Sequence, residues 1–196
     1  MSAALRPDLA LIAGHVAPGS RVLDIGCGDG ALMAELRNRG CDARGMELDP
    51  SDVARCVEHG LPVIQGDADA DLPLYPDASF DYAVLSQTLQ TTKRPDRVLD
   101  ELLRIGRHAV VSFPNFAHWR VRFSLLTQGR MPVTRLIPVS WYETPNIHHL
   151  TVADFRALVA ERGIVVEAEW FLAGDRQISG LWANWRAEHA VFVLRK

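Results

Sequence analysis

The chain has 196 residues, a formal net charge of −3 and 48% apolar residues, values typical of one soluble globular domain spanning 1–196. The small negative charge gives no electrostatic basis for binding nucleic acid or an anionic membrane, and no apolar run approaches the ~20 residues of a membrane span or the pattern of a signal peptide. Three widely spaced cysteines, Cys27, Cys41 and Cys56, have no CxxC pairing and indicate reduced thiols in the cytoplasm.

Strands and helices are predicted to alternate from residue 21 onward. Asp49 is a predicted helix N-cap followed by proline, and Thr151 with Asp154 resembles a capping box. The pattern predicts an α/β fold: three layers, doubly wound, with a mainly parallel seven-stranded sheet that binds ligands beyond the carboxyl ends of its strands. The predicted strands are 21–25, 42–48, 61–64, 80–85, 108–112, 164–169 and 190–194.

The first strand runs into a turn with glycine at three alternate positions, Gly26, Gly28 and Gly30. Without a Cβ, the backbone can turn sharply there and approach a ligand, and the helix that follows favours a polar ligand. Asp24 fits the D-x-G-x-G-x-G form of S-adenosylmethionine (AdoMet) sites and would repel a pyrophosphate, whereas Gly26, Gly28 and Ala31 also fit the dinucleotide fingerprint. AdoMet is favoured; a dinucleotide and a purely structural turn stay open.

Polar residues also follow the next three strands. Glu47 ends the second strand, where a carboxylate can accept hydrogen bonds from a ribose diol. Asp67 beside the small Ala68 suits an adenine ring, and Ser86 with Gln87 follows the fourth strand, facing the glycine turn across the cleft. The alternatives are a solvated charge at Glu47 and an ordinary acidic turn at Asp67.

One segment, at about 113–145, departs from the alternation. It is rich in aromatic residues and has no acidic residue between Ser112 and Glu143. A segment this long usually has a role, and arginine with aromatic residues is typical of interface cores. It is interpreted as a substrate lid or a partner surface, with an apolar cap as the alternative, and we expect a partner to contact Trp119, Arg120, Arg122 and Trp141. Its other arginines are Arg130 and Arg135.

The glycine turn and the polar strand ends together resemble the class I AdoMet-dependent methyltransferases, over roughly residues 15 to 115 and by topology over the last forty. The resemblance implies a class I methyltransferase-like Rossmann fold with AdoMet or S-adenosylhomocysteine as cofactor. The cofactor-binding residues expected from the motifs and this resemblance are Asp24, Gly26, Cys27, Gly28, Glu47, Leu48, Asp67, Ala68, Ser86 and Gln87.

Four motifs occur together in a combination similar to the MetW proteins of bacterial methionine biosynthesis: Leu23–Gly30, Ser86–Gln90, Val111–Trp119 and Trp141–His149. This resemblance implies a subunit that works beside the homoserine O-acyltransferase MetX and supports its activity, without a generally assigned methyl acceptor.

The alternative is an AdoMet-dependent methyltransferase acting on a small molecule. Methyl transfer needs in-line positioning more than protein functional groups, and the N/D-P-P-Y/F element of amino-methylating enzymes is absent after the fourth strand. His118, His148 and His149 are candidate bases, but nothing in the sequence pairs with them, and no metal-ligand spacing is recognisable. The sequence therefore assigns no catalytic residue and no metal.

Overall fold

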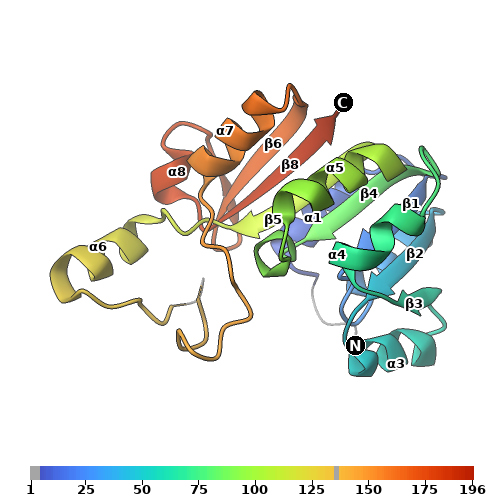
Figure 1. Cartoon of the computed structure of the whole chain (residues 1–196), viewed down its shortest axis with the longest axis horizontal. Helices are drawn as coiled ribbons and strands as arrows, with labels where there is room; N and C mark the ends of the chain where they lie inside the picture. The colour runs from blue at the N-terminus through green and yellow to red at the C-terminus, as the bar shows by residue number, and fades with distance from the viewer. Residues whose placement is uncertain (1–4, 135–136) are drawn as a thin grey trace.

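A single mixed sheet organises the molecule (Figure 1). The computed structural model describes residues 5–134 and 137–196, and within them the strand order is β3-β2-β1-β4-β5-β8-β6-β7. The first five strands pair in parallel, whereas β8, β6 and β7 pair antiparallel. The strands are β1 (Arg21–Ile25), β2 (Asp42–Glu47), β3 (Val63–Gln65), β4 (Phe80–Ser86), β5 (Gly106–Pro114), β6 (Val165–Ala173), β7 (Arg176–Ile178) and β8 (His189–Arg195).

Helices cover both faces of the sheet, so the molecule has three layers (Figure 1). On one face α1 and α2 pack through buried side chains such as Ile12 and Leu36; on the other, α5 and α7 pack through Leu99 and Phe155. The helices are α1 (Pro7–His15), α2 (Ala31–Asn38), α3 (Pro50–Glu58), α4 (Ala68–Asp71), α5 (Pro95–Ile105), α6 (Trp119–Gln128), α7 (Val152–Glu161) and α8 (Ala183–Arg186), with 3-10 turns η1 (Leu72–Leu74) and η2 (Leu89–Thr91).

The expected three-layer α/β fold with a mainly parallel sheet is confirmed. The described residues form eight strands rather than seven, because β6 continues through a tight turn into the three-residue β7. The local helix signals are also confirmed: the Asp49 side chain accepts from the Ser51 N–H, and Thr151 with Asp154 forms both bonds of a capping box.

Other boundaries differ from the sequence-based expectation. β3 lies two residues later at its start, and β5 extends beyond 108–112 at both ends. Phe113, expected in the inserted segment, belongs to β5 and is fully buried between Phe155 and Phe192. The helix α6 had no apolar stripe to reveal it, since Val121 is its buried residue.

Residues 117–134 and 137–150, called the arm below, lie between β5 and α7 in the chain, and their described parts lie away from the sheet (Figure 1). In the figure α6 and the chain after it extend away from the sheet, in yellow and orange. Phe116, Val121 and Ile137 form a small apolar cluster within this region. Arg135 lies outside the described residues.

Every helix among residues 5–134 and 137–196 is too short or too polar to cross a lipid bilayer.

Candidate functional site

Glycine is required at the three positions of the turn after β1 for different reasons. A Cβ on Gly26 would lie 2.4 Å from Oγ1 of Thr88, and one on Gly30 would lie 2.3 Å from Cδ1 of Leu61, so these two positions are filled by the protein's own packing. A Cβ on Gly28, whose φ is +56°, would meet nothing within 4 Å. Of the three, Gly28 therefore faces the space that a ligand can occupy.

Glu47, at the end of β2, is bound to this turn. Its Oε2 accepts from the Gly28 N–H at 2.7 Å, and its Oε1 accepts from the N–H groups of Leu48 and Asp49 at 2.8 and 3.0 Å. Three backbone donors thus hold the carboxylate in one orientation at the mouth of the turn. An ionised carboxylate has about four acceptor positions, so a diol that donates two hydrogen bonds must replace one of these amides.

The amides of the turn are mostly used within the protein. The N–H groups of Gly26 and Cys27 both donate to the Met46 carbonyl, and that of Gly28 donates to Glu47. The turn is therefore not an open cradle for a phosphate, and two carboxylates stand beside it. This electrostatic setting disfavours a pyrophosphate and suits a ligand that carries positive charge.

Asp24 is the second of these carboxylates. It is 2% exposed in β1, and its Oδ1 has no hydrogen-bond partner in the described structure. Burial raises the pKa of Asp24 to about 7; Arg6 opposes the rise and Glu47 adds to it. A buried carboxyl with one unpartnered oxygen at the ligand edge of a parallel sheet is a candidate acceptor for an ammonium group.

Cys27 lies in the turn and is buried. Burial strongly raises the pKa of the Cys27 thiol, and the Asp24 charge raises it further. The thiol is therefore a packing group rather than a nucleophile.

The predicted adenine edge follows β3. Asp67 caps α4, its Oδ1 accepting from the Asp69 N–H at 2.9 Å while its own N–H donates to Asp71 at 2.7 Å. Ala68 begins α4 and packs against the core, and Leu48 is exposed on the loop after β2. These residues lie at the carboxyl ends of β2 and β3, beside the glycine turn in the sheet order.

Ser86 and Gln87, at the end of β4, belong to a polar cluster that the sequence did not reveal. Asp8 of α1, 2% exposed, accepts hydrogen bonds from Ser86 Oγ, Ser112 Oγ and Gln87 Nε2 at 3.0–3.2 Å. Arg6 donates to Asp8 and, at 2.9 Å, to Ser86 Oγ. Burial opposes ionisation of Asp8, but Arg6 and the Ser112 hydroxyl outweigh it and hold its pKa below the ordinary value.

Gln87 has a left-handed backbone, with φ of +52°. Hydrogen bonds from its N–H to the Ser112 carbonyl (2.8 Å) and from its amide to Asp8 hold it there. A non-glycine residue in this conformation costs free energy, and such residues gather at functional sites. Arg6 and Asp8 could have been suspected from two charges beside an apolar N-terminal run, but no local pattern pairs them with β4 and β5.

The residues of the proposed cofactor site fit AdoMet by their chemistry. The buried Asp24, whose Oδ1 has no hydrogen-bond partner among the described residues, suits the ammonium. Glu47 suits the ribose, and the open face of Gly28 leaves space between them. Asp67 with Ala68 flanks the adenine side. All ten residues expected from the sequence lie in the turns and strand ends at one edge of β1–β4.

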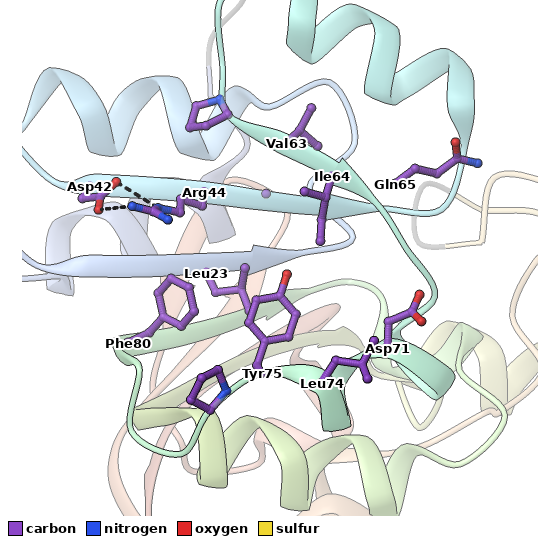
Figure 2. A pocket seen from close by; sticks show the side chains of 13 residues that line it. Leu23, Asp42, Arg44, Val63, Ile64, Gln65, Asp71, Leu74, Tyr75 and Phe80 are labelled. Atoms are coloured by element: carbon purple, nitrogen blue, oxygen red, sulfur yellow. Dashed lines mark hydrogen bonds and ion pairs between the residues drawn. The ribbon is translucent and has the colours of Figure 1, made fainter.

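A large cavity lies elsewhere, beside β2 and β3 on the face that the short α4 leaves open (Figure 2). Its volume is about 770 Å³. Figure 2 shows Leu23, Ile64, Leu74 and Tyr75 around it, with Arg44 paired to Asp42 at its rim. The wall is mainly apolar and contains none of the expected cofactor residues, so we do not assign the cofactor to this cavity.

The arm presents large apolar side chains to solvent. Leu126 is 85% exposed, Trp141 76% and Tyr142 71%, while Trp119 and Phe123 are also exposed. Exposed apolar patches of this kind mark interaction surfaces. Of the predicted contacts, Trp119 lies under the Arg120 guanidinium at 5.3 Å.

The exposed surface continues onto the loop before β8, which the sequence analysis missed. The Arg122 guanidinium lies 5.3 Å from the ring centroid of Trp185, and its Nε donates to the Ala117 carbonyl. Leu181 and Trp182 are exposed next to it. Two tryptophans close together, Trp182 and Trp185, are the sequence feature from which this part of the surface could have been predicted.

Asn115 connects the start of the arm to α7 and α8 through side-chain hydrogen bonds. Fully buried, it donates through Nδ2 to the carbonyls of Asn184 and Ala187 at 3.2 and 2.9 Å. Its Oδ1 accepts from the N–H groups of Ala117, the first residue of the arm, and Val152, the first residue of α7. One side chain thus joins the arm to α7 and α8.

The three histidines considered as bases have separate structural contacts. His118 caps α6 by accepting from the Arg120 N–H, and burial lowers its pKa. The backbone N–H of His148 donates to the Gln90 carbonyl, while the ring Nε2 of His148 is buried without a hydrogen-bond partner among the described residues. The His149 ring packs edge-on against Phe116. Among the described residues, no group of three His, Cys, Asp or Glu side chains gathers as a metal site would require.

Comparison with known proteins identifies the family of this chain. The family model described as "Methionine biosynthesis protein MetW" matches residues 6–194. A "Bifunctional methionine biosynthesis protein MetXA/MetW" of Rhodopirellula baltica is 36% identical over 168 residues, which are 81% of this chain and 27% of that protein. The chain thus spans about a quarter of that relative's length.

More distant matches are methyltransferases. A ubiquinone biosynthesis O-methyltransferase of Photorhabdus laumondii is 31% identical over 106 residues, 50% of this chain and 44% of that enzyme. A solved AdoMet-dependent methyltransferase from Mesorhizobium loti superposes with a TM-score of 0.71 at 17% identity, covering 97% of this chain and 98% of that one. At that identity the structural likeness establishes the fold alone.

Proposed function

The chain belongs to the MetW family of methionine biosynthesis proteins, and from that premise we propose that it is an AdoMet-binding subunit that partners with the homoserine O-acyltransferase MetX and supports its activity. The observation that carries the proposal is the fused relative, which joins a MetXA part and a MetW part in one chain. Covalent linkage gives two modules a high effective concentration. Separate chains with the same joint role must instead associate through surfaces of their own.

The arm supplies a suitable surface. Its exposed Trp119 and Trp141, with Arg120 and Arg122 nearby, have the composition in which interfaces concentrate binding energy. No acidic residue lies between Ser112 and Glu143, so the complementary face of MetX should present carboxylates or carbonyls to the arginines.

Through the cofactor site, the proposed subunit would respond to the concentration of AdoMet. When bound, AdoMet would place its ammonium at Asp24, its ribose at Glu47 and its adenine beside Asp67 and Ala68. Ser86 and Gln87 would border the methionine moiety. AdoMet can change the affinity for MetX only if it binds the free and the associated subunit with different affinities.

The test is co-purification of this protein with its MetX partner, followed by acyltransferase assays with and without AdoMet. We expect a stable complex whose acyltransferase activity exceeds that of MetX alone. If the two proteins elute separately and MetX is fully active by itself, the partnership is refuted. The assay belongs in reducing buffer, since the proposed setting is the cytoplasm.

The second candidate is a methyltransferase that acts on a small molecule. It is favoured by the identity with the ubiquinone biosynthesis O-methyltransferase along half of the chain. Since positioning can suffice for methyl transfer, the structural contacts of His118, His148 and His149 do not exclude it. Formation of S-adenosylhomocysteine by the isolated protein would favour this candidate, whereas binding without turnover favours the MetX subunit.

A further inference from the structure

A second hollow lies beside the proposed cofactor site, at the same edge of the sheet. It has a volume of about 450 Å³ and lies between the start of α6, the end of β6 and the segment before β8. Its wall includes His118, Trp119, Arg120, Arg186 and Glu188; it is called the arginine hollow below.

The arginine hollow continues toward the cofactor residues. A smaller hollow of about 220 Å³ is lined by Arg6, Asp8 and Gln87, and the two share Gly174 and Glu188 as common wall. Gln87 follows β4, whereas Glu188 precedes β8, two strands further along the sheet. The arginine hollow therefore stands where a second small molecule can lie next to one bound at the glycine turn.

Its charges are arranged in two groups. The guanidinium groups of Arg120 and Arg186 have no carboxylate partner in the described part of the chain, and that of Arg120 is supported by the Trp119 ring at 5.3 Å. Glu188 supplies the negative charge, and its Oε2 accepts from the Gly174 N–H at 2.9 Å, which fixes its position. Burial lowers the pKa of His118, so at neutral pH it adds a polar but uncharged wall.

We propose that the arginine hollow binds a free α-amino acid with an uncharged side chain. Its carboxylate would pair with Arg120 and Arg186, and its ammonium with Glu188. A simple carboxylate would leave Glu188 facing an anion, and a simple amine would leave both guanidinium groups unmatched. A zwitterion satisfies both groups, and the ring of Trp119 with Ala173 offers an apolar wall for its side chain.

The hollow favours a small molecule over a carboxylate of a partner protein. Through Gly174 and Glu188 it adjoins the hollow of Asp8 and Gln87 at the strand ends. Trp119 is the one exposed aromatic residue of the described arm in its wall, whereas Phe123, Trp141 and Tyr142 lie outside it. This inference does not depend on the proposed partnership with MetX.

The experiment is calorimetry on the full chain with L-methionine as the probe, with and without saturating S-adenosylhomocysteine. We expect saturable L-methionine binding that persists when S-adenosylhomocysteine is bound. L-Methionine methyl ester, which lacks the carboxylate, and 4-(methylthio)butanoate, which lacks the ammonium, should each bind at least tenfold more weakly. Absence of L-methionine binding at millimolar concentration, or full competition with S-adenosylhomocysteine, would overturn the proposal.

Two variants locate the site. Arg186→Ala should weaken L-methionine binding about tenfold or more and leave S-adenosylhomocysteine affinity unchanged, while Arg176→Ala, an exposed arginine on β7 outside the hollow, should change neither. Glu188→Gln keeps an amide oxygen for the Gly174 N–H, and should weaken L-methionine but not 4-(methylthio)butanoate. If Arg186→Ala retains L-methionine affinity and instead loses association with MetX, the arginine is a partner contact and the amino-acid site is refuted.

Discussion

The N–H of Gly28 donates a hydrogen bond of 2.7 Å to Oε2 of Glu47. The glycine turn after β1 and the carboxylate at the end of β2 are therefore one unit rather than two neighbouring motifs. The contact orients Glu47 toward the open face of Gly28, where a Cβ would meet nothing within 4 Å. A ribose placed there meets an acceptor that three backbone amides have already positioned.

Removing that acceptor should weaken cofactor binding. In Glu47→Ala we expect AdoMet affinity to fall, by roughly 1.5–3 kcal/mol at most for each hydrogen bond lost to the charged acceptor. Calorimetry with S-adenosylhomocysteine measures the change, and Glu58→Ala, an exposed glutamate at the end of α3, serves as control. Undiminished affinity would remove Glu47 from the site.

Gly28→Val should abolish AdoMet binding while the fold survives, because the added methyl groups would enter the ligand's space. Gly163→Val is the matched control: its φ is +64°, against +56° for Gly28, and a Cβ there also meets nothing within 4 Å. Both variants carry the same kind of backbone strain, so their melting temperatures should fall comparably. Normal binding by Gly28→Val would place the ligand elsewhere, and outright unfolding of that variant alone would indicate a structural turn.

AdoMet binding should weaken as the pH falls from 8 to 6. Burial raises the pKa of Asp24 to about 7, and only the ionised carboxyl can pair with the ligand's ammonium. Calorimetry across this range should show the loss in the wild-type protein and a weak, nearly pH-independent affinity in Asp24→Asn. A wild-type profile parallel to that of the variant would mean that Asp24 does not hold the ligand.

Asp24 should also make the fold less stable in alkaline solution. Its folded pKa of about 7 lies above the ordinary aspartate value of 3.8, so its stabilising contribution is full below pH 3.8 and is lost as the pH rises through about 7. At pH 8, Asp24→Asn should therefore be more stable than the wild type, with an upper bound of about 4 kcal/mol. Urea unfolding at pH 5 and pH 8 measures this, and an advantage no larger at pH 8 than at pH 5 would contradict it.

Asn115→Ala should destabilise the protein by about 3 kcal/mol, because buried carbonyls and amides lose their partners. Hydrogen exchange should then accelerate across the arm, whose first residue Asn115 joins to α7. Asn38→Ala, at the exposed end of α2, is the control and should change stability by less than about 0.5 kcal/mol. Unchanged exchange in the arm would show that Asn115 is not its fastening point.

Truncating the arm's anchors should weaken the complex with MetX. Arg120→Ala combined with Arg122→Ala, and separately Trp141→Ala, should each reduce association by about 2 kcal/mol or more if these are true anchors, with cofactor affinity intact. Trp141 lies outside the arginine hollow, so its effect is independent of that site. The control is Arg44→Ala with Arg55→Ala, exposed arginines of β2 and α3. Normal assembly and activation by the arm variants would refute docking through these residues, and altered AdoMet turnover by the isolated double variant would favour the methyltransferase.

Short-range patterns of residue types were enough to predict the features that a few neighbouring residues encode. The helix starts at Asp49 and Thr151, the glycine turn and the alternation of strands and helices depend on local hydrogen bonds and backbone sterics, which the spacing of residue types records. Which distant groups come into contact could be seen only in the folded protein. Asp8 reaches Ser112 across 104 positions, Gly30 is required by Leu61 rather than by a ligand, and Arg186 comes to the same hollow as Arg120. Each of these contacts joins segments that are far apart in the chain, and packing between remote segments leaves no periodic signal in either one.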